Sequence, residues 1–320
     1  ITVKDIVDDV FMILIMFIVC AKIVGVLGWR REILKISRSF QTSGLEPKTF
    51  DELAIQKQYD NTIRFYCLAY IIMCDVASSG NTLGRFFGNQ RLNILPYRIY
   101  LPYNYSKPFL YRFTVLLQSI TVFIAGSIDA GFDTLFFGII LQITSKINIL
   151  KHRFQEIVTT LAEIHDKKSD YIKDYNKIEY NLFTNWIKSH NAIITLYDDS
   201  EFVFSKVIFV QYSLSALSLC ITVYLISQME IFTTEFMGNF AYLIAATCEI
   251  FVFCIAANQV TFERTFQQFA DLSLAIYNTK WFALSMSAKK NIILMMGRTL
   301  RPIIFSSGHL VVLSLESFKS

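Results

Sequence analysis

Long apolar runs alternate with polar, basic connections along this chain. Spanning a bilayer as a helix takes about 20 mostly apolar residues, and five of the runs reach roughly that length, whereas the sixth is too short. A soluble core of this size could not hide so much apolar surface in such long runs. The pattern therefore predicts a polytopic α-helical membrane protein. The runs are Val10–Leu27, Ile63–Leu83, Phe113–Ile143, Phe202–Ser227, Phe240–Phe262 and Ile303–Leu315.

The first run contains one charged residue, Lys22, which lies near its end and is expected to extend its ammonium to the membrane interface. The residues before the run are acidic, Asp5, Asp8 and Asp9, where a signal peptide would be basic. No clear small-residue cleavage site follows. We therefore expect a mature membrane span. Composition agrees with the class, because 53% of the 320 residues are hydrophobic.

Basic residues predict the topology, since cytoplasmic loops are enriched in Lys and Arg. They are concentrated after the first, third and fifth runs, whereas the connection Gln228–Asn239 has none. The connection Arg85–Arg112 disagrees, with five basic residues and no acid. Its neighbours outweigh it, so we place the long basic connections in the cytoplasm. The sequon Asn104-Tyr105-Ser106 then lies outside, which makes Asn104 a candidate glycosylation site.

The connection after the third run carries two helical patterns. Apolar residues recur at helical spacing from Leu150 to Ile164, and again from Leu182 to Tyr197, with charged residues between them. Each pattern is continuous with a neighbouring apolar run. We expect two long helices that project into the cytoplasm; the alternative is an amphipathic pair lying on the membrane surface.

Enzyme chemistry has little support in this sequence. The four histidines are scattered without zinc-ligand spacing, and no phosphate-binding glycine loop, nucleophile elbow or Cys-x-x-Cys pair occurs. All six cysteines lie in apolar segments, where a free thiol behaves as a small hydrophobe, so no external disulfide is expected. We predict that the protein is not an enzyme and uses no cofactor, metal or nucleic acid.

Four acids lie within or near the apolar runs: Asp75, Asp129, Asp133 and Glu249. Such residues are costly in hydrocarbon and usually face a bundle interior or an aqueous route. A proton-coupled carrier is one interpretation. No basic partner accompanies the acids at helical spacing, which favours structural hydrogen bonding inside the bundle.

The C-terminal stretches "AIYNTKW", "KKNIILMMGRTLRP" and "SSGHLVVLSLESF" resemble the C-terminal signature of the insect odorant receptor family. Two further stretches fit, Ser106–Tyr111 and Asp133–Phe154. The matching C-terminal positions are Ala275, Tyr277, Trp281, Lys290, Met295, Met296, Arg298, Pro302, Gly308, Leu313, Ser314, Leu315 and Phe318.

The resemblance implies a seven-helix receptor with a cytoplasmic N-terminus, in the plasma membrane of olfactory sensory neurons. It implies a heterotetramer with a co-receptor subunit that forms a ligand-gated, non-selective cation channel, surrounded by membrane lipid. Residues 1–320 would form a single domain whose segments 145–205 and 263–302 build an intersubunit anchor. By this comparison the first helix and the second half of the seventh are missing, so we expect a partial sequence of a tuning subunit. Anchor candidates are Tyr277, Trp281, Met295, Arg298 and Pro302.

The resemblance also implies a pocket for a small volatile, apolar odorant in the outer half of the bundle. Depth and helical spacing nominate residues there, and the alternative for each is a side chain that faces lipid or packs the bundle. A gustatory receptor of the same architecture remains an alternative, as does a proton-coupled carrier. The nominated ligand-binding residues are Phe11, Leu14, Met73, Val76, Gly80, Leu117, Ile120, Phe240 and Tyr242.

Overall fold

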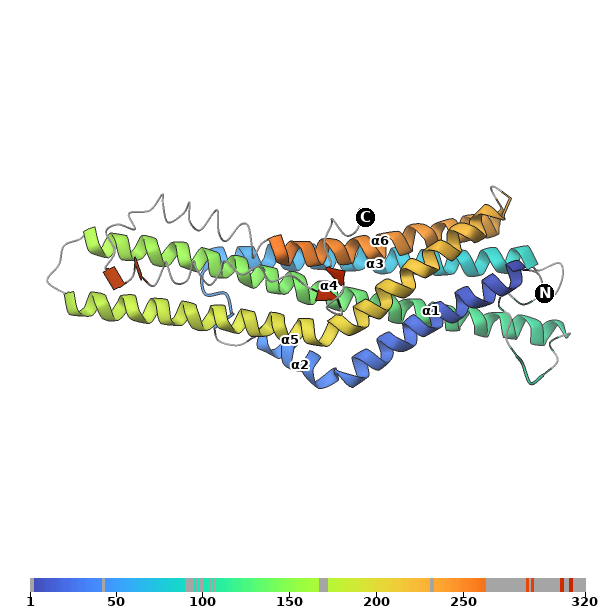
Figure 1. Cartoon of the computed structure of the whole chain (residues 1–320), viewed down its shortest axis with the longest axis horizontal. Coiled ribbons are helices and arrows are strands. Elements are labelled where there is room, and N and C mark those ends of the chain that lie inside the picture. Colours follow the sequence, from blue (N-terminus) through green and yellow to red (C-terminus); the bar gives the residue numbers. More distant parts are fainter. Residues whose placement is uncertain are drawn as a thin grey trace. The chain divides into compact units, whose positions relative to one another are not determined.

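Long helices make up most of the described chain (Figure 1). The computed structural model describes residues 3–41, 44–89, 95, 97, 100–103, 105, 107–166, 172–230, 233–262, 286–287, 289–290, 306–307 and 311–312. One short antiparallel pair of two-residue strands is also present, with Ser306 opposite Val312. The all-α fold class is confirmed. The elements are α1 (Val3–Gly28), α2 (Arg30–Ser39), α3 (Phe50–Asn89), α4 (Pro108–Asp166), α5 (Ile172–Ser227), α6 (Thr234–Phe262), β1 (Ser306–Ser307) and β2 (Val311–Val312).

The predicted apolar runs coincide with these helices. Among the described residues, four helices are long and apolar enough to cross a membrane, and α6 adds the shorter apolar stretch Phe236–Phe251. Each of the first five runs lies within one helix. The sixth, Ile303–Leu315, lies mostly outside the described residues. The four candidate spans are Asp9–Gly28, Phe50–Gly80, Pro108–Leu161 and Lys177–Ser227.

Helix α3 begins well before its apolar run, and its first turn shows why. The Thr49 hydroxyl accepts a hydrogen bond from the Glu52 backbone N–H at 3.3 Å. The Glu52 carboxylate accepts one from the Lys48 N–H at 2.6 Å. This Thr-x-x-Glu arrangement resembles a capping box, which satisfies backbone donors at a helix start. Thr233 caps α6 in a similar way through the N–H of Phe236.

The two amphipathic patterns form continuous extensions of apolar helices, as predicted. Helix α4 runs unbroken from Pro108 to Asp166, and α5 runs from Ile172 to Ser227. Pro108 suits the first turn of α4, where its missing N–H costs nothing. Along the extensions the apolar face is buried at Phe154, Val158, Leu161, Phe183, Trp186 and Ile193.

The chain divides into two compact units. The first unit comprises Ile1–Trp29, Phe65–Phe137 and Lys206–Phe253. The second comprises Arg30–Arg64, Gly138–Ser205 and Cys254–Ser320. The segments nominated for the anchor, 145–205 and 263–302, fall within the second unit. Their role as an anchor stays a prediction, and most of 263–302 lies outside the described residues.

An aromatic core holds α4 and α5 together inside the second unit. The Phe154 ring lies edge-on to Trp186, with 5.3 Å between ring centroids. Aromatic pairs of this geometry add stabilisation beyond the area that they bury. The Trp186 indole N–H donates to the carbonyl of Leu150 at 2.9 Å, so its polar atom is satisfied in the buried core.

The segment between α2 and α3 is held to α4 by Arg153. Its Nε donates to Glu52 Oε1 at 2.8 Å, and its Nη2 donates to Glu52 Oε2 at 2.9 Å. Its Nη1 donates to the Gly44 carbonyl at 2.7 Å, and Nη2 also reaches the Glu46 carbonyl. A bidentate guanidinium–carboxylate pair of this kind is strong and directional. This set of contacts, called here the Arg153 clamp, neutralises the buried Glu52.

A second ion pair in this unit is exposed. Lys35 Nζ lies 2.8 Å from Asp199 Oδ2, and 65% of the Lys35 side chain is accessible. The hydrogen bond to Asp199, together with its negative charge, raises the pKa of Lys35 above its usual value. Exposed pairs of this kind contribute little to stability because water screens them.

In the first unit, two glycines mark close helix approaches. A Cβ at Gly25 would lie 2.6 Å from Val207, and a Cβ at Gly126 would lie 2.8 Å from the Ser78 hydroxyl oxygen. Small residues at such points let helix backbones approach within a membrane bundle. By contrast, α1 exposes a row of apolar side chains, as expected for a surface in contact with lipid: Ile13, Phe17, Val24 and Leu27.

Candidate functional site

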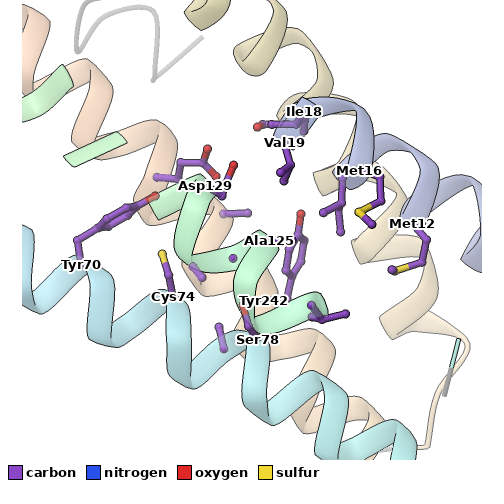
Figure 2. Close-up of a pocket in the computed structure, with 18 of the residues that line it drawn as sticks. Met12, Met16, Ile18, Val19, Tyr70, Cys74, Ser78, Ala125, Asp129 and Tyr242 are labelled. Atoms are coloured by element: carbon purple, nitrogen blue, oxygen red, sulfur yellow. The ribbon is translucent and has the colours of Figure 1, made fainter. Parts of the chain in front are cut away.

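A cavity of about 110 Å³ lies inside the first unit, among α1, α3, α4, α5 and α6 (Figure 2). Much of its lining is apolar, with small alanines leaving the space open. The apolar lining residues are Met12, Ile15, Met16, Ile18, Val19, Ala77, Val122, Ala125, Gly126, Ala245 and Ala246. The polar ones are Tyr70, Cys74, Ser78, Tyr97, Asp129, Ser215, Tyr242 and Glu249.

Helical spacing brings the lining residues to one face of each helix. Tyr70, Cys74 and Ser78 follow one another along α3 at intervals of four, and Figure 2 shows them in a row. Ala125 and Asp129 repeat this spacing on α4. The wall from α1 carries two methionines, whose flexible side chains adapt to irregular space.

Buried charges adjoin this cavity. Lys22 of α1 places its ammonium 2.6 Å from Asp129 Oδ1 and 2.6 Å from Asp133 Oδ1. Glu249 of α6 lies 3.6 Å from the same ammonium. Lys22 and Asp133 are 1% and 2% exposed, whereas Asp129 and Glu249 retain 26% and 13%. We call Lys22, Asp129, Asp133 and Glu249 the charge cluster.

Two neutral residues complete the hydrogen bonding of the charge cluster. The Tyr70 hydroxyl donates to Asp133 Oδ2 at 2.9 Å. The Gln211 amide nitrogen donates to Asp133 Oδ1 at 3.1 Å and to Glu249 Oε1. Helices α1, α3, α4, α5 and α6 thus all contribute to one polar network inside an apolar bundle. Buried charges are tolerated only with partners of this kind.

The structure corrects two expectations about charge. Lys22 does not extend toward the interface, because it is 1% exposed and paired inside the bundle. The acids do have a basic partner, and it comes from a different helix. Lys22 and Asp133 are 111 positions apart in sequence, so helical spacing could not detect the pair. Asp75 does not belong to the charge cluster, and its Oδ1 is buried with no partner among the described residues.

Three carboxylates of the charge cluster have oxygens within 4.8 Å of one another, a spacing that could hold a cation. The Lys22 ammonium lies among them. In the second unit, Glu52, His152 and Glu156 also have ligand atoms within 4.8 Å, but the Arg153 clamp already engages Glu52.

A second hollow of about 210 Å³ is lined by residues of α3, α4 and α6. It has almost entirely apolar walls, and it shares Tyr70 with the first cavity. Asp133 contributes to it from the charge cluster. The remaining lining residues are Tyr66, Cys67, Ala69, Met73, Thr134, Phe137 and Cys248.

The nominated ligand-binding residues fall in several places, and their contact with a ligand stays a prediction. Tyr242 lines the first cavity, and Met73 lines the second. Phe11 is fully buried and packs edge-on against Tyr242, at 5.0 Å between ring centroids. Leu14 is half-buried, and no described atom lies within 4 Å of the position that a Cβ at Gly80 would take. The structure exposes Val76, Leu117, Ile120 and Phe240.

Sequence reasoning missed the alanines that open the cavity, because an alanine in an apolar run carries no distinguishing signal. It singled out Asp129 and Glu249 as costly residues but did not place them at a ligand cavity. The anchor candidates Tyr277, Trp281, Met295, Arg298 and Pro302 lie outside the described residues, as does Asn104.

Comparison with known proteins decides the family. The model of the 7tm odorant receptor family matches residues 2–320. The chain belongs to the 7tm odorant receptor family. This membership confirms the resemblance seen in the sequence, and it agrees with the expectation that the protein is a receptor and not an enzyme.

Odorant receptors of other insects are similar over much of the chain. Odorant receptor Or1 of Anopheles gambiae is 23% identical over 72% of this chain and 58% of its own length. Odorant receptor 10 of Aedes albopictus is 22% identical over 83% of this chain and 67% of its own. The match to Or1 thus spans less than two thirds of that receptor.

Solved structures show the same fold. The insect olfactory receptor OR5 from Machilis hrabei superposes with a TM-score of 0.75 at 14% identity. The match covers 98% of this chain and 77% of that one. The same receptor in complex with eugenol matches equally, with a TM-score of 0.75.

Proposed function

We propose that this odorant receptor binds a small volatile organic molecule in the cavity bounded by Met16, Ala77, Ala125 and Tyr242. We propose further that it assembles with a co-receptor subunit into a tetramer and gates a non-selective cation channel. The plasma membrane of olfactory sensory neurons is the proposed location. The observation that carries the first part is a largely apolar cavity inside the helix bundle of an odorant receptor.

The physics of volatile ligands supports this site. Volatile molecules have few polar groups, so their affinity comes mainly from removing apolar surface from water, at roughly 25 cal/mol per Å². Ligand sites of this kind are concave and mostly apolar, with a few placed polar groups. The cavity has this character, because alanine, methionine and valine surround a small number of hydroxyl and carboxyl groups.

The channel and the co-receptor are supported by family membership alone. OR5 from Machilis hrabei has been solved with eugenol, which supports odorant binding by this fold. The contacts that this chain would make with a co-receptor are proposed for the second unit, where the predicted anchor segments 145–205 and 263–302 fall.

Adjacent residues of α3 provide the test. Ala77 lines the cavity, whereas Val76 is 64% exposed and does not. Ala77→Phe should fill the cavity and lower the response to every active odorant by roughly five- to a hundredfold, because overpacking a site costs about 1–3 kcal/mol. Val76→Phe adds a similar bulk outside the cavity and should leave odorant ranking unchanged. Currents would be recorded over a volatile panel, with surface expression measured for each variant.

If Ala77→Phe reaches the surface normally and its odorant response is unchanged, the ligand does not bind in this cavity. Omitting the co-receptor from the same cells tests the channel. Currents of wild-type size without it would show that the proposed heteromer is not required.

The alternatives make different predictions in these cells. The family match favours an odorant receptor over a gustatory receptor. The charge cluster is the observation that fits a proton-coupled carrier, because it groups partnered ionisable residues within the bundle. A carrier would transport its substrate without a co-receptor, and its current would follow the proton gradient.

A further inference from the structure

We infer that the ligand of this cavity is a small organic amine, held as its ammonium ion by Asp129 and Glu249. This inference rests on the proposed function, because it names the chemical class of ligand at the same site.

Exposure divides the charge cluster into two parts. Lys22 and Asp133 are 1% and 2% exposed and do not line the cavity, and the Lys22 ammonium lies 2.6 Å from both Asp133 Oδ1 and Asp129 Oδ1. Asp129 and Glu249 line the cavity and are more exposed. The single ammonium of Lys22 is therefore shared by three carboxylates, and two of these, Asp129 and Glu249, border the open space.

The described part of the cavity wall supplies no positive charge. Among the described residues that line the cavity, none is Lys, Arg or His. Uncompensated charge in a water-poor site is costly, and an opposite charge that enters such a site is attracted strongly. A cationic group next to Asp129 and Glu249 would thus be stabilised, whereas an anionic ligand would be repelled.

Gln211 belongs to the hydrogen-bond network behind these carboxylates. Its side chain is buried, with 3% exposure, and its amide nitrogen is bonded to Asp133 and Glu249. Its amide oxygen is buried without a donor among the described residues. A buried acceptor without a donor is rare and costly. An ammonium brings three N–H donors, and the carboxylate oxygens of Asp129 and Glu249 at the cavity wall can accept them.

An organic amine fits this cavity better than an inorganic cation does. The Lys22 ammonium already lies among the three carboxylates where a metal ion would have to bind. Metal ions such as Ca²⁺ also require six to eight oxygen ligands, and the remaining wall is largely apolar. An amine places its charged end at Asp129 and Glu249 and its hydrocarbon body against Met16, Ala77 and Ala125. Aliphatic amines, like the lysine side chain, carry a proton at neutral pH.

The test compares three molecules of one shape: cyclohexylamine, cyclohexanol and methylcyclohexane. Binding would be measured as thermal stabilisation of the purified full-length receptor at neutral pH. The amine should reach half-saturation at a concentration roughly ten- to a hundredfold lower than either neutral analogue, as expected for a charge-assisted hydrogen bond. Equal binding of all three, or tighter binding of a neutral analogue, would overturn the inference.

Variants locate the effect. Asp129→Asn and Glu249→Gln should each remove most of the preference for the amine and change binding of cyclohexanol by less than about threefold. Asp75→Asn is the matched control, since it neutralises an acid of α3 that does not line the cavity. A retained amine preference in both Asp129→Asn and Glu249→Gln would show that these carboxylates serve only the bundle. Two variants are used because either one alone could fail to fold.

Further measurements separate this inference from the proposed function. Ala77→Phe should weaken the binding of all three molecules, which would identify the cavity as their common site. If Ala77→Phe weakens the binding of all three molecules but the wild-type receptor shows no preference for the amine, the amine inference fails. The cavity then remains the proposed ligand site. If Ala77→Phe leaves the binding of all three molecules unchanged, both the proposed ligand cavity and the amine inference fail. Sodium chloride would be tested in the same assay. If it stabilises the receptor and competes with the amine, the site binds an inorganic cation and the amine inference fails.

Discussion

The two units each bury charge, but they balance it differently. In the second unit, the Arg153 clamp matches one guanidinium with one carboxylate and two backbone carbonyls. In the first unit, one ammonium faces three carboxylates beside an open cavity. Arg153 joins the segment between α2 and α3 to α4, whereas Lys22 joins α1 to α4 and α6.

The difference separates a structural ion pair from a candidate site. A balanced pair with its donors satisfied gives geometric specificity and leaves nothing for a ligand to complete. An unbalanced group next to a cavity leaves electrostatic and hydrogen-bonding capacity unused. Perturbed charge in a concave site is a common feature of binding sites, and this combination distinguishes the first unit.

The largest expected effect is that of Lys22→Met. The substitution nearly keeps the side-chain length but leaves three carboxylates without a base, and removing one partner from buried ion pairs costs about 3–5 kcal/mol. We expect a strongly lowered unfolding temperature and yield of receptor in detergent. Lys57→Met, which replaces an exposed lysine of α3, is the control. Wild-type stability of Lys22→Met would mean that the charge cluster does not hold the bundle together.

A smaller loss is expected for Arg153→Met. Glu52 would lose its charged partner, yet its carboxylate would keep the hydrogen bond from the backbone N–H of Lys48. We expect a loss of about 2–3 kcal/mol in unfolding free energy, read from thermal unfolding. Adding Glu52→Gln should recover part of it, because the buried charge is then removed. A double variant less stable than Arg153→Met would contradict this account of the clamp.

The smallest effect belongs to Lys35→Gln, which breaks the exposed pair with Asp199. Because the folded-state pKa of Lys35 is raised, any stability from the pair is fully present below the unfolded lysine pKa and is lost as pH rises through the folded one. Between about pH 6 and pH 9 the pair therefore makes its full contribution, which is small because water screens it, so thermal unfolding of Lys35→Gln should stay close to wild type with a difference that does not change with pH. A clear loss of stability in this range would show that the exposed Lys35–Asp199 pair contributes to stability much as a buried pair does.

The fold was largely predictable from the sequence, because apolar run length and helical period are local signals. They located α1, α3, α4, α5 and α6, and they showed that α4 and α5 continue beyond their apolar runs. The early start of α3 was missed although its signal is present, since Thr49 and Glu52 have capping-box spacing. The site was harder, because the Lys22–Asp133 pair depends on which faces of distant helices meet.

The ligand candidates show the same limit at finer scale. Depth and period placed the candidate residues on α1, α3, α4 and α6, which also line the cavity, but a helix rotation of one residue separates Val76 from Ala77. Helix rotation is set by packing against neighbours, for which a single apolar sequence gives little information.

The close approach at Gly126 has a consequence for how such a receptor can evolve. Gly126 and Ser78 both line the cavity, and a single Cβ at position 126 would lie 2.8 Å from the Ser78 hydroxyl oxygen. One base change in a glycine codon yields alanine, so the smallest heritable step at this position adds one methyl group. That group requires Ser78 to move or the two helices to separate, and either adjustment changes the space left for a guest molecule. Gly126 therefore gives natural selection a position where one nucleotide alters the dimensions of the cavity.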